Sequence, residues 1–233
     1  MGRLIGIVPA RQGSKGVVDK NRRAFAGSNL VTIAVMSALE ICDEVVVTSD
    51  ADDILSLVAG IDRVRLVLRP SILAEDSSPV EMAIKHLFDT GILSENDNCV
   101  LLQTTMPFRS ASQLAKMKDI FERNNYDALI GVSKLDAKAH PDWSLRLGSQ
   151  NELTLSDGRH PREIPAQRQL LEPMYTRNDY AYFVKGSFAK DGDLYGNTCI
   201  GFLNSESMLI DINSELDFEF AQYMYNKLQN RGA

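Results

Sequence analysis

The sequence predicts one three-layer α/β domain whose central sheet is mostly parallel. Short apolar runs rich in β-branched residues, such as residues 44–50, alternate with longer segments whose apolar residues recur at helical spacing. Such alternation is typical of parallel strands joined by right-handed helical crossovers. A length of 233 residues is enough for a single domain, residues 1–233, that carries a small insertion.

The expected elements follow one another in a regular order. We expect strands over residues 5–9, 44–50, 64–68, 98–103, 128–133, 180–184, 198–202 and 208–211. Helices are expected over residues 30–41, 51–59, 79–90, 111–123 and 214–228. The last helix begins with the capping-box pattern Ser214-x-x-Asp217, and its spacing predicts that it buries Leu216, Phe220, Tyr223 and Met224.

Residues 134–175 interrupt the alternation. This stretch is polar and marked by prolines, with only short strand-like pieces at residues 143–147 and 152–155. It is expected to be an insertion that packs against a second subunit. The alternative is a long surface loop without a partner.

Composition excludes several classes of protein. The net charge of −6 argues against a nucleic-acid polymer as partner, because phosphate backbones demand a broad basic face. No apolar run is long enough to span a membrane, and no leader-like segment precedes the first strand, so a cytoplasmic location is expected. The cysteines are odd in number and lack metal-binding spacing, which indicates reduced packing residues: Cys42, Cys99 and Cys199.

A basic loop follows the first strand. It contains Arg11, Lys15 and Lys20 together with Gly13, Ser14 and Gly16. Glycines allow close backbone approach to a ligand, and the cationic side chains supply fixed charge for phosphate oxygens. The spacing matches neither common nucleotide-binding glycine motif. The simplest ligand is a nucleoside triphosphate, and the alternative is a solvated turn.

Polar clusters also follow the next strands, where the carboxyl ends of parallel strands form a ligand-binding crevice. These clusters are Ser49-Asp50, Arg69-Pro70 and Gln103-Thr104-Thr105. Each has a structural alternative, since Asp50 is a good helix cap and the threonines suit a turn. Their joint occurrence at strand ends favours one shared site.

The order of residues in the loop resembles a known family. Ala10-Arg11-Gln12-Gly13-Ser14-Lys15-Gly16, followed by Lys20-Asn21, is similar to the A-R-x-x-S-K-G-x-x-x-K-N signature of the CMP-sialic acid synthetases, or N-acylneuraminate cytidylyltransferases. Further blocks of that family are matched in order, across almost the whole chain, by residues 48–50, 69–70, 73–76, 101–109 and 210–217.

The resemblance implies a Rossmann-like nucleotidyltransferase fold and transfer of CMP from CTP to the anomeric hydroxyl of a sialic-acid-like nonulosonic acid, with release of pyrophosphate. It implies a homodimer and assigns catalysis to Arg11, Lys20 and Asp211. The nucleotide would be bound by Ala10, Arg11, Gly13, Ser14, Lys15, Lys20, Asn21 and Arg69.

The same resemblance implies Mg²⁺ as cofactor, held by Asp211 and by the residue two positions later. The family normally has a second aspartate there, but this chain has Asn213, which can still offer an amide oxygen without charge. A helix-capping role for Asn213 is the alternative.

For the acceptor sugar, the resemblance points to Gln103, Arg168, Gln169, Asn178 and Tyr182. Arg177 stands one position out of register, and Asp179-Tyr180 replace small residues of the family. Such a pocket suits a legionaminic- or pseudaminic-type acid as well as sialic acid. The alternatives are a cytidylyltransferase for Kdo, a sugar-1-phosphate nucleotidyltransferase, and a nucleotide-binding homologue without activity.

Overall fold

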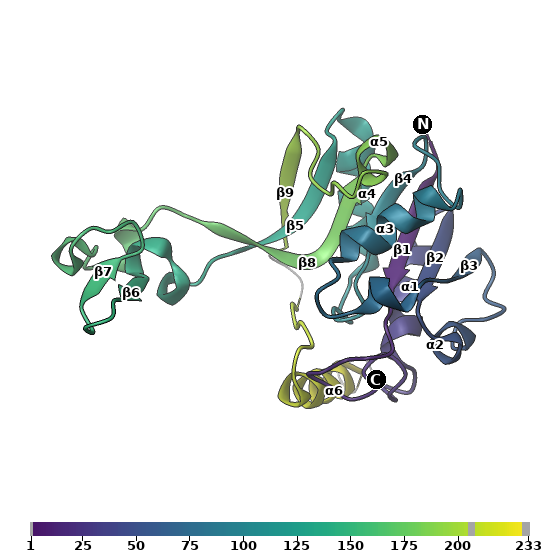
Figure 1. Ribbon diagram of the computed structural model, residues 1–233, viewed down its shortest axis with the longest axis horizontal. Helices are drawn as coiled ribbons and strands as arrows, with labels where there is room; N and C mark the ends of the chain where they lie inside the picture. Colours follow the sequence, from purple (N-terminus) through teal and green to yellow (C-terminus); the bar gives the residue numbers. More distant parts are fainter. Residues whose placement is uncertain (1, 205–207, 230–233) are drawn as a thin grey trace. The chain divides into compact units, whose positions relative to one another are not determined.

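The computed structural model describes residues 2–204 and 208–229 (Figure 1). Contacts between residues divide the chain into two compact units. The first, here called the core unit, runs to Gly131 and resumes at Asp179, and the second, the inserted unit, spans Val132–Asn178. The insertion expected over residues 134–175 falls within the inserted unit.

A seven-stranded sheet organises the fold, with the strand order β3-β2-β1-β4-β8-β5-β9. The pairs β1–β2, β1–β4 and β2–β3 are parallel, whereas β4 and β8 are antiparallel. The expected mostly parallel α/β class is therefore confirmed. The strands are β1 (Leu4–Pro9), β2 (Glu44–Ser49), β3 (Val64–Leu68), β4 (Asn98–Leu101), β5 (Ala128–Lys134), β8 (Tyr175–Val184) and β9 (Cys199–Leu203).

Helices cover both faces of the sheet, because successive strand residues point to opposite sides. Val45 and Val47 pack into one hydrophobic cluster, and Val46 packs into the other. The first cluster receives residues of α1 (Leu30–Leu39), α2 (Asp52–Ser56) and α4 (Ala111–Arg123). The second receives residues of α3 (Val80–Asp89) and α5 (Gly186–Ala189). Continuous apolar strands such as β2 follow from burial on both sides.

The C-terminal helix α6 (Glu215–Gln229) lies beside the segment that follows β1, seen as yellow against purple in Figure 1. Its Phe218 contacts Phe25 edge to face at 5.4 Å, in a small third cluster that includes Ala221. The prediction that Leu216, Phe220 and Tyr223 are buried is wrong, since these side chains are 75%, 52% and 59% exposed, and Met224 is only half-buried. The face of α6 that carries Phe218 packs inward, because Phe218 makes an aromatic contact with Phe25.

The start of α6 is as expected, but the segment before it is not a strand. The Ser214 hydroxyl accepts from the Asp217 backbone N–H at 3.3 Å, and the Asp217 carboxylate accepts from the Ser214 N–H at 2.8 Å, which confirms the capping box. Residues 208–211 belong to no strand, contrary to the prediction. Directly after these residues, the Ile212 N–H donates to Thr105 O at 3.0 Å, and this contact holds the main chain in place.

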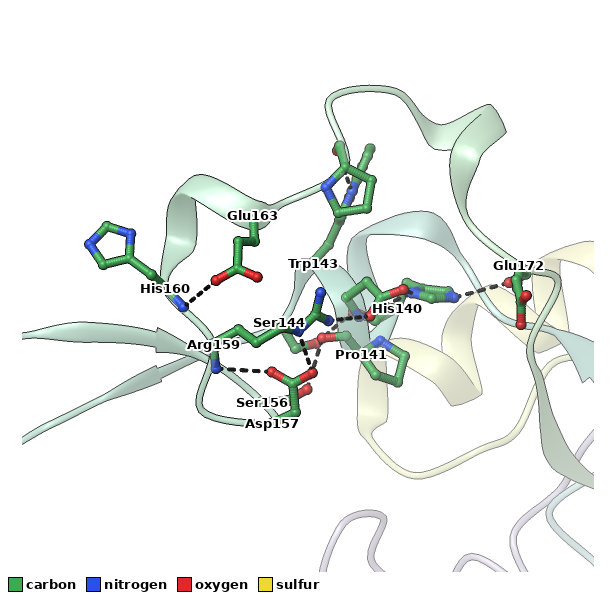
Figure 2. A network of polar contacts seen from close by, with 12 residues as sticks. His140, Pro141, Trp143, Ser144, Ser156, Asp157, Arg159, His160, Glu163 and Glu172 are labelled. Carbon is green, nitrogen blue, oxygen red and sulfur yellow. Dashed lines mark hydrogen bonds and ion pairs between the residues drawn. The ribbon is translucent and has the colours of Figure 1, made fainter.

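The inserted unit is held together mainly by polar contacts (Figure 2). It contains the antiparallel pair β6 (Leu145–Leu147) and β7 (Leu153–Leu155) and four short 3₁₀ turns: Ala137–Ala139, Pro141–Trp143, Pro161–Glu163 and Arg168–Leu170. His140 anchors the network, with its Nε2 3.0 Å from Glu172 O and its Nδ1 accepting from the Asp142 N–H at 3.1 Å. Among its apolar side chains, only Leu155 is fully buried.

In the described part of the chain, no helix combines the length and apolar character needed to cross a bilayer. All three cysteines are free. Cys42 and Cys99 are buried as expected, and burial raises the pKa of Cys42 to about 12. Cys199 is exposed on β9, so it is not a packing residue.

Candidate functional site

The candidate site lies where β1, β2 and β4 end. Parallel register pairs Pro9 with Thr48 and Ile7 with Leu101, so the segments that follow these three strands meet at one edge of the sheet. A cavity of about 250 Å³ opens there. Its lining includes residues from three of the four polar clusters: Arg11, Ser14, Lys20, Asn21, Arg69, Gln103, Thr104 and Thr105.

Hydrogen bonds fix the loop that follows β1. The Asn21 amide donates to Arg11 O at 2.8 Å, and the buried Thr104 hydroxyl donates to Asn21 Oδ1 at 2.7 Å. The Gln12 N–H donates to Asp50 Oδ1 at 3.0 Å. Asp50 therefore braces the loop, and Ala51 is the residue that precedes α2 as its N-cap. The remaining polar cluster, Ser49-Asp50, therefore contributes to the site by positioning the basic loop.

Two cations of the loop are paired with one carboxylate. Asp76 Oδ1 lies 2.7 Å from Arg11 Nη1, and Asp76 Oδ2 forms an ion pair with Lys15. Hydrogen bonds from Lys15 and Arg11 hold the pKa of Asp76 below its usual value. These partly exposed pairs are weak enough to be exchanged. An incoming anion can thus replace Asp76 as the partner of both cations.

Arg69 is a buried cation that lacks partners for part of its guanidinium. The residue is only 6% exposed, and burial lowers its pKa. Within the described residues, its Nε and Nη1 atoms have no hydrogen-bond partner although they are buried. Leaving such donors unpaired costs about 1–3 kcal/mol each in a folded protein. The cost is recovered when a ligand with acceptor oxygens or nitrogens enters the cavity that Arg69 lines.

Lys20 of the loop lies close to Asp211, in the segment that precedes α6. Lys20 Nζ donates to Ile212 O at 2.8 Å. Burial lowers the pKa of Lys20, and the charge of Asp211 opposes that shift. The Asn213 amide donates to Asp211 Oδ2 at 2.6 Å, while Asp211 Oδ1 is buried and has no partner in residues 2–204 or 208–229. Because Ser214 caps α6, the Asn213 side chain interacts with Asp211 and does not act as the cap.

The donor set around Asp211 fits a small, hard cation. An unpartnered carboxylate oxygen is the kind of ligand that Mg²⁺ takes from a protein when phosphates and water supply the rest. No group of three or more His, Cys, Asp or Glu residues in the described ranges forms a metal cage. The arrangement suits an ion that arrives with an anionic ligand.

Of the remaining expected nucleotide contacts, Gly13 and Lys15 lie beside this cavity, whereas Ala10 does not line it. Gly13 and Lys15 line a second cavity of about 530 Å³, which shares Arg11, Ser14 and Asp76 with the first. Ala10 is buried in the hydrophobic core, where its side chain is withdrawn from the cavity, and its N–H donates to Thr48 O at 3.0 Å. Asp76 is a site residue that the sequence patterns did not predict, and its position after the third strand is the signal that could have indicated it.

The five expected acceptor residues fall in both units. Gln103 lines the first cavity, and the buried Tyr182 donates its hydroxyl to Asp179 in the core unit. In the inserted unit, Arg168 and Gln169 line a separate cavity of about 530 Å³. The amide of Asn178 donates to Ser133 Oγ at 3.0 Å, also within the inserted unit.

Comparison of folds defines the class. The structure of CMP:2-keto-3-deoxy-manno-octonic acid synthetase in complex with CTP superposes with a TM-score of 0.70 over 97% of this chain and 99% of that chain, at 11% identity. A 4-diphosphocytidyl-2C-methyl-D-erythritol synthase from Anaerococcus prevotii gives 0.63 over 97% and 96%, at 13% identity. The fold is that of the Rossmann-like nucleotidyltransferases.

Comparison of sequences then defines the family. The Cytidylyltransferase family model matches residues 5–187. The chain is 28% identical to a CMP-N,N'-diacetyllegionaminic acid synthase of Legionella pneumophila, over 94% of this chain and 95% of that one. It is 24% identical to an N-acylneuraminate cytidylyltransferase of Escherichia coli, of which it spans 51%. The chain belongs to the cytidylyltransferase family and is a nucleotidyltransferase, which confirms the resemblance.

Gly16 permits the closest approach in the site and gives a direct test of it. A Cβ at Gly16 would lie 1.8 Å from Asn213 O, whereas a Cβ at Gly13 meets nothing within 4 Å. We expect Gly16→Ala to lower the free energy of unfolding by about 1–3 kcal/mol, because the loop must move away from residues 211–213. Gly13→Ala should stay within about 0.5 kcal/mol. Urea unfolding measures both, and equal effects would contradict the contact.

Proposed function

We propose that this protein transfers CMP from CTP to the anomeric hydroxyl of a nonulosonic acid. The hydroxyl oxygen forms a bond to the α-phosphorus, and the bond from that phosphorus to the bridging oxygen of the β-phosphate breaks. Pyrophosphate leaves with that oxygen, and the hydroxyl proton passes to water. The observation that carries this proposal is the cavity at the ends of β1 and β4, which Arg11, Lys20 and Arg69 line, with Asp211 close to Lys20. Relatives named as synthases of CMP-sugars support it.

The cationic side chains have distinct roles in this proposal. Arg11 and Lys15 bind the triphosphate after exchanging Asp76 for phosphate oxygens, and the Ser14 hydroxyl adds a hydrogen bond. Lys20 neutralises charge that develops as pyrophosphate leaves. Such groups are effective because they are already in position before the substrate binds. Asn21 keeps the loop in register through its contacts with Arg11 O and Thr104.

Arg69 recognises the nucleotide in this proposal. Its Nε and Nη1 donors are buried without a partner among the described residues, and its side chain lines the cavity. A cytosine base carries a carbonyl oxygen and a ring nitrogen that accept hydrogen bonds. A ligand that pairs these donors removes the cost of leaving them buried.

We also propose Mg²⁺ as the cofactor, with Asp211 as its charged protein ligand and Asn213 as an auxiliary one. The unpartnered Oδ1 of Asp211 supports the first assignment. The ion would polarise the phosphates and neutralise their charge when bound. The protein's own contribution is to hold Asp211 beside the loop, through Lys20 and the main chain of Ile212.

The acceptor proposed is a sialic-acid-like nonulosonic acid, of the legionaminic, pseudaminic or sialic type. Relatives named for all three types support this class, including a pseudaminic acid cytidylyltransferase of Campylobacter jejuni that is 21% identical over 94% of both chains. Kdo is the alternative acceptor, favoured by the fold of the CMP:2-keto-3-deoxy-manno-octonic acid synthetase. Gln103 would contact the acceptor from the core unit.

A homodimer formed through the inserted unit completes the proposal. Register places Leu145, Leu147 and Leu153 on one face of the β6–β7 pair, and these side chains are 43%, 67% and 46% exposed. Adjacent exposed leucines on a small unit with little core of its own favour a protein partner. A second copy would bring Arg168 and Gln169 toward the neighbouring acceptor site.

Pyrophosphate release tests the reaction. The purified protein, mixed with CTP, Mg²⁺ and a panel of nonulosonic acids and Kdo, should release pyrophosphate with at least one nonulosonic acid. Lys20→Met should lower kcat/KM by about 10- to 150-fold, which is the loss of one charge-assisted hydrogen bond. Lys85→Met, which removes an exposed ion pair with Asp89 on α3, is the matched control and should be active. Absence of turnover with every acceptor would refute the proposed function.

Exchange of Asn213 for aspartate tests the metal assignment. Asn213→Asp replaces the Asn213 amide, which donates to the Asp211 carboxylate, with a second carboxylate. We expect about tenfold less Mg²⁺ to be needed for half-maximal rate, because affinity rises with the charge of the ligands. The same variant should melt at lower temperature in EDTA, since two carboxylates then repel each other. An unchanged or higher Mg²⁺ requirement would argue against metal binding here.

Charged residues on the leucine face test the dimer. The variant Leu147→Lys with Leu153→Lys should sediment as a monomer, because two lysines cannot be buried without partners. Thr154→Lys is the control, since Thr154 pairs with Arg146 on the other face of the same two strands. Sedimentation equilibrium distinguishes the species. A wild-type monomer, or a double variant that still dimerises, would contradict the proposed interface.

A further inference from the structure

One turn, residues 103–106, joins the three parts of the site. Gln103 lines the cavity, and the Thr104 hydroxyl donates to Asn21 Oδ1 on the nucleotide side at 2.7 Å. Thr105 O accepts from the Ile212 N–H at 3.0 Å, directly after Asp211. A shift of this turn would displace the acceptor contact, the loop and the metal ligand relative to one another.

The Arg109 side chain donates hydrogen bonds to the main chain of this turn. The four hydrogen bonds that the described residues give its guanidinium all end at main-chain carbonyls. Two lie in the turn, at Gln103 O and Met106 O, both 2.7 Å away. The other two lie on β8, at Tyr180 O (2.6 Å) and Asp179 O (3.5 Å). Nη2 alone contacts both Gln103 O and Asp179 O, so a single atom links the turn to β8.

The chemistry of this contact requires an arginine. Burial lowers the pKa of Arg109 to about 10, which leaves the guanidinium charged at neutral pH. Burying a cation is costly, and a planar fork of five donors recovers that cost by bonding several carbonyls in fixed directions. Lysine has a single nitrogen and cannot reach carbonyls on both the turn and the strand in this arrangement.

Strand β8, to which Arg109 donates, has a constrained backbone conformation at Asp179. Asp179 has φ +54°, a conformation that costs energy for a residue with a side chain. Its carboxylate accepts the Tyr182 hydroxyl, and its carbonyl faces Arg109. Next to Arg109, the Ser110 N–H donates to the Tyr180 hydroxyl at 2.7 Å. Both ends of the link are therefore fixed, as positioning of a reactive group demands.

We propose that Arg109 is a positioning residue for the transfer reaction: through the turn at residues 103–106 it sets the acceptor contact of Gln103 relative to the segment that carries Asp211. This inference rests on the proposed function. Arg109 does not line the cavity at the strand ends, and four of its five donors are bonded to main-chain carbonyls. Its effect falls mainly on the acceptor, since the loop is also held at Asp50, away from this turn.

The test compares Arg109→Lys with Arg63→Lys. Arg63 also donates to two main-chain carbonyls, Cys42 O at 2.9 Å and Leu39 O at 3.3 Å, away from the site. We expect R109K to lower kcat/KM for the acceptor by about 30- to 100-fold, as misplacement by an ångström does. Its Kd for CTP should stay within about threefold of wild type, because that binding has separate contacts. R63K should lower stability and leave kcat/KM unchanged.

Hydrogen exchange supplies a readout that does not need activity. In R109K, amide exchange should become faster in residues 103–107 and 211–213, and these segments should be unchanged in R63K. If R109K does not fold, R109Q, which buries no charge, replaces it with the same expected shifts. Unchanged kinetics and exchange in a folded variant would overturn the inference, as would an equal loss of CTP binding and acceptor turnover. A wild-type protein without turnover would refute the proposed function, while exchange would still decide the role of Arg109.

Discussion

The parallel pairing of β1 with β2 on one side and β4 on the other is the constraint on which the site depends. It brings together segments that are far apart in sequence, such as the basic loop and the turn that begins at Gln103. Main-chain hydrogen bonds fix the register, and burial on both faces fixes the side-chain alternation, so a slip of one residue would expose the core. The cavity is therefore positioned by the paired strands of the sheet, while its charged groups lie on the segments beyond the strands.

Those charged groups are held in a state suited to an anionic ligand. Asp76 is paired with Arg11 and Lys15, whereas Arg69 has buried donors, and Asp211 a buried oxygen, that find no partner among the described residues. Exposed ion pairs cost little to exchange, but unpaired buried groups gain from a ligand. The two kinds of group together favour a bound anion over an empty cavity. The same C-terminal segment joins the site to α6, whose Phe218 packs on Phe25.

Much of the fold was predictable from local patterns, and the errors have physical causes. The bounds of β3 and α4 agree with prediction to the residue, because period and flanking turns coincide there. The inward face of α6 was predicted wrongly, since Leu216 and Phe220 also recur at helical spacing and only contact with Phe25 selects Phe218 instead. The hydrophobicity of residues 208–211 predicted a strand, but these residues pair with no strand of the sheet.

The sequence by itself determined the α/β class, the strand-end clusters and the family, because these depend on residue types at fixed spacing along the chain. Only the tertiary structure decided which charges meet. Asp76 lies against Arg11, and Asn213 turns to Asp211 because Ser214 already caps the helix. Arg109 reaches across 71 residues of sequence to Tyr180 O. Such contacts join distant segments through the sheet, and no local periodicity encodes the distance between them.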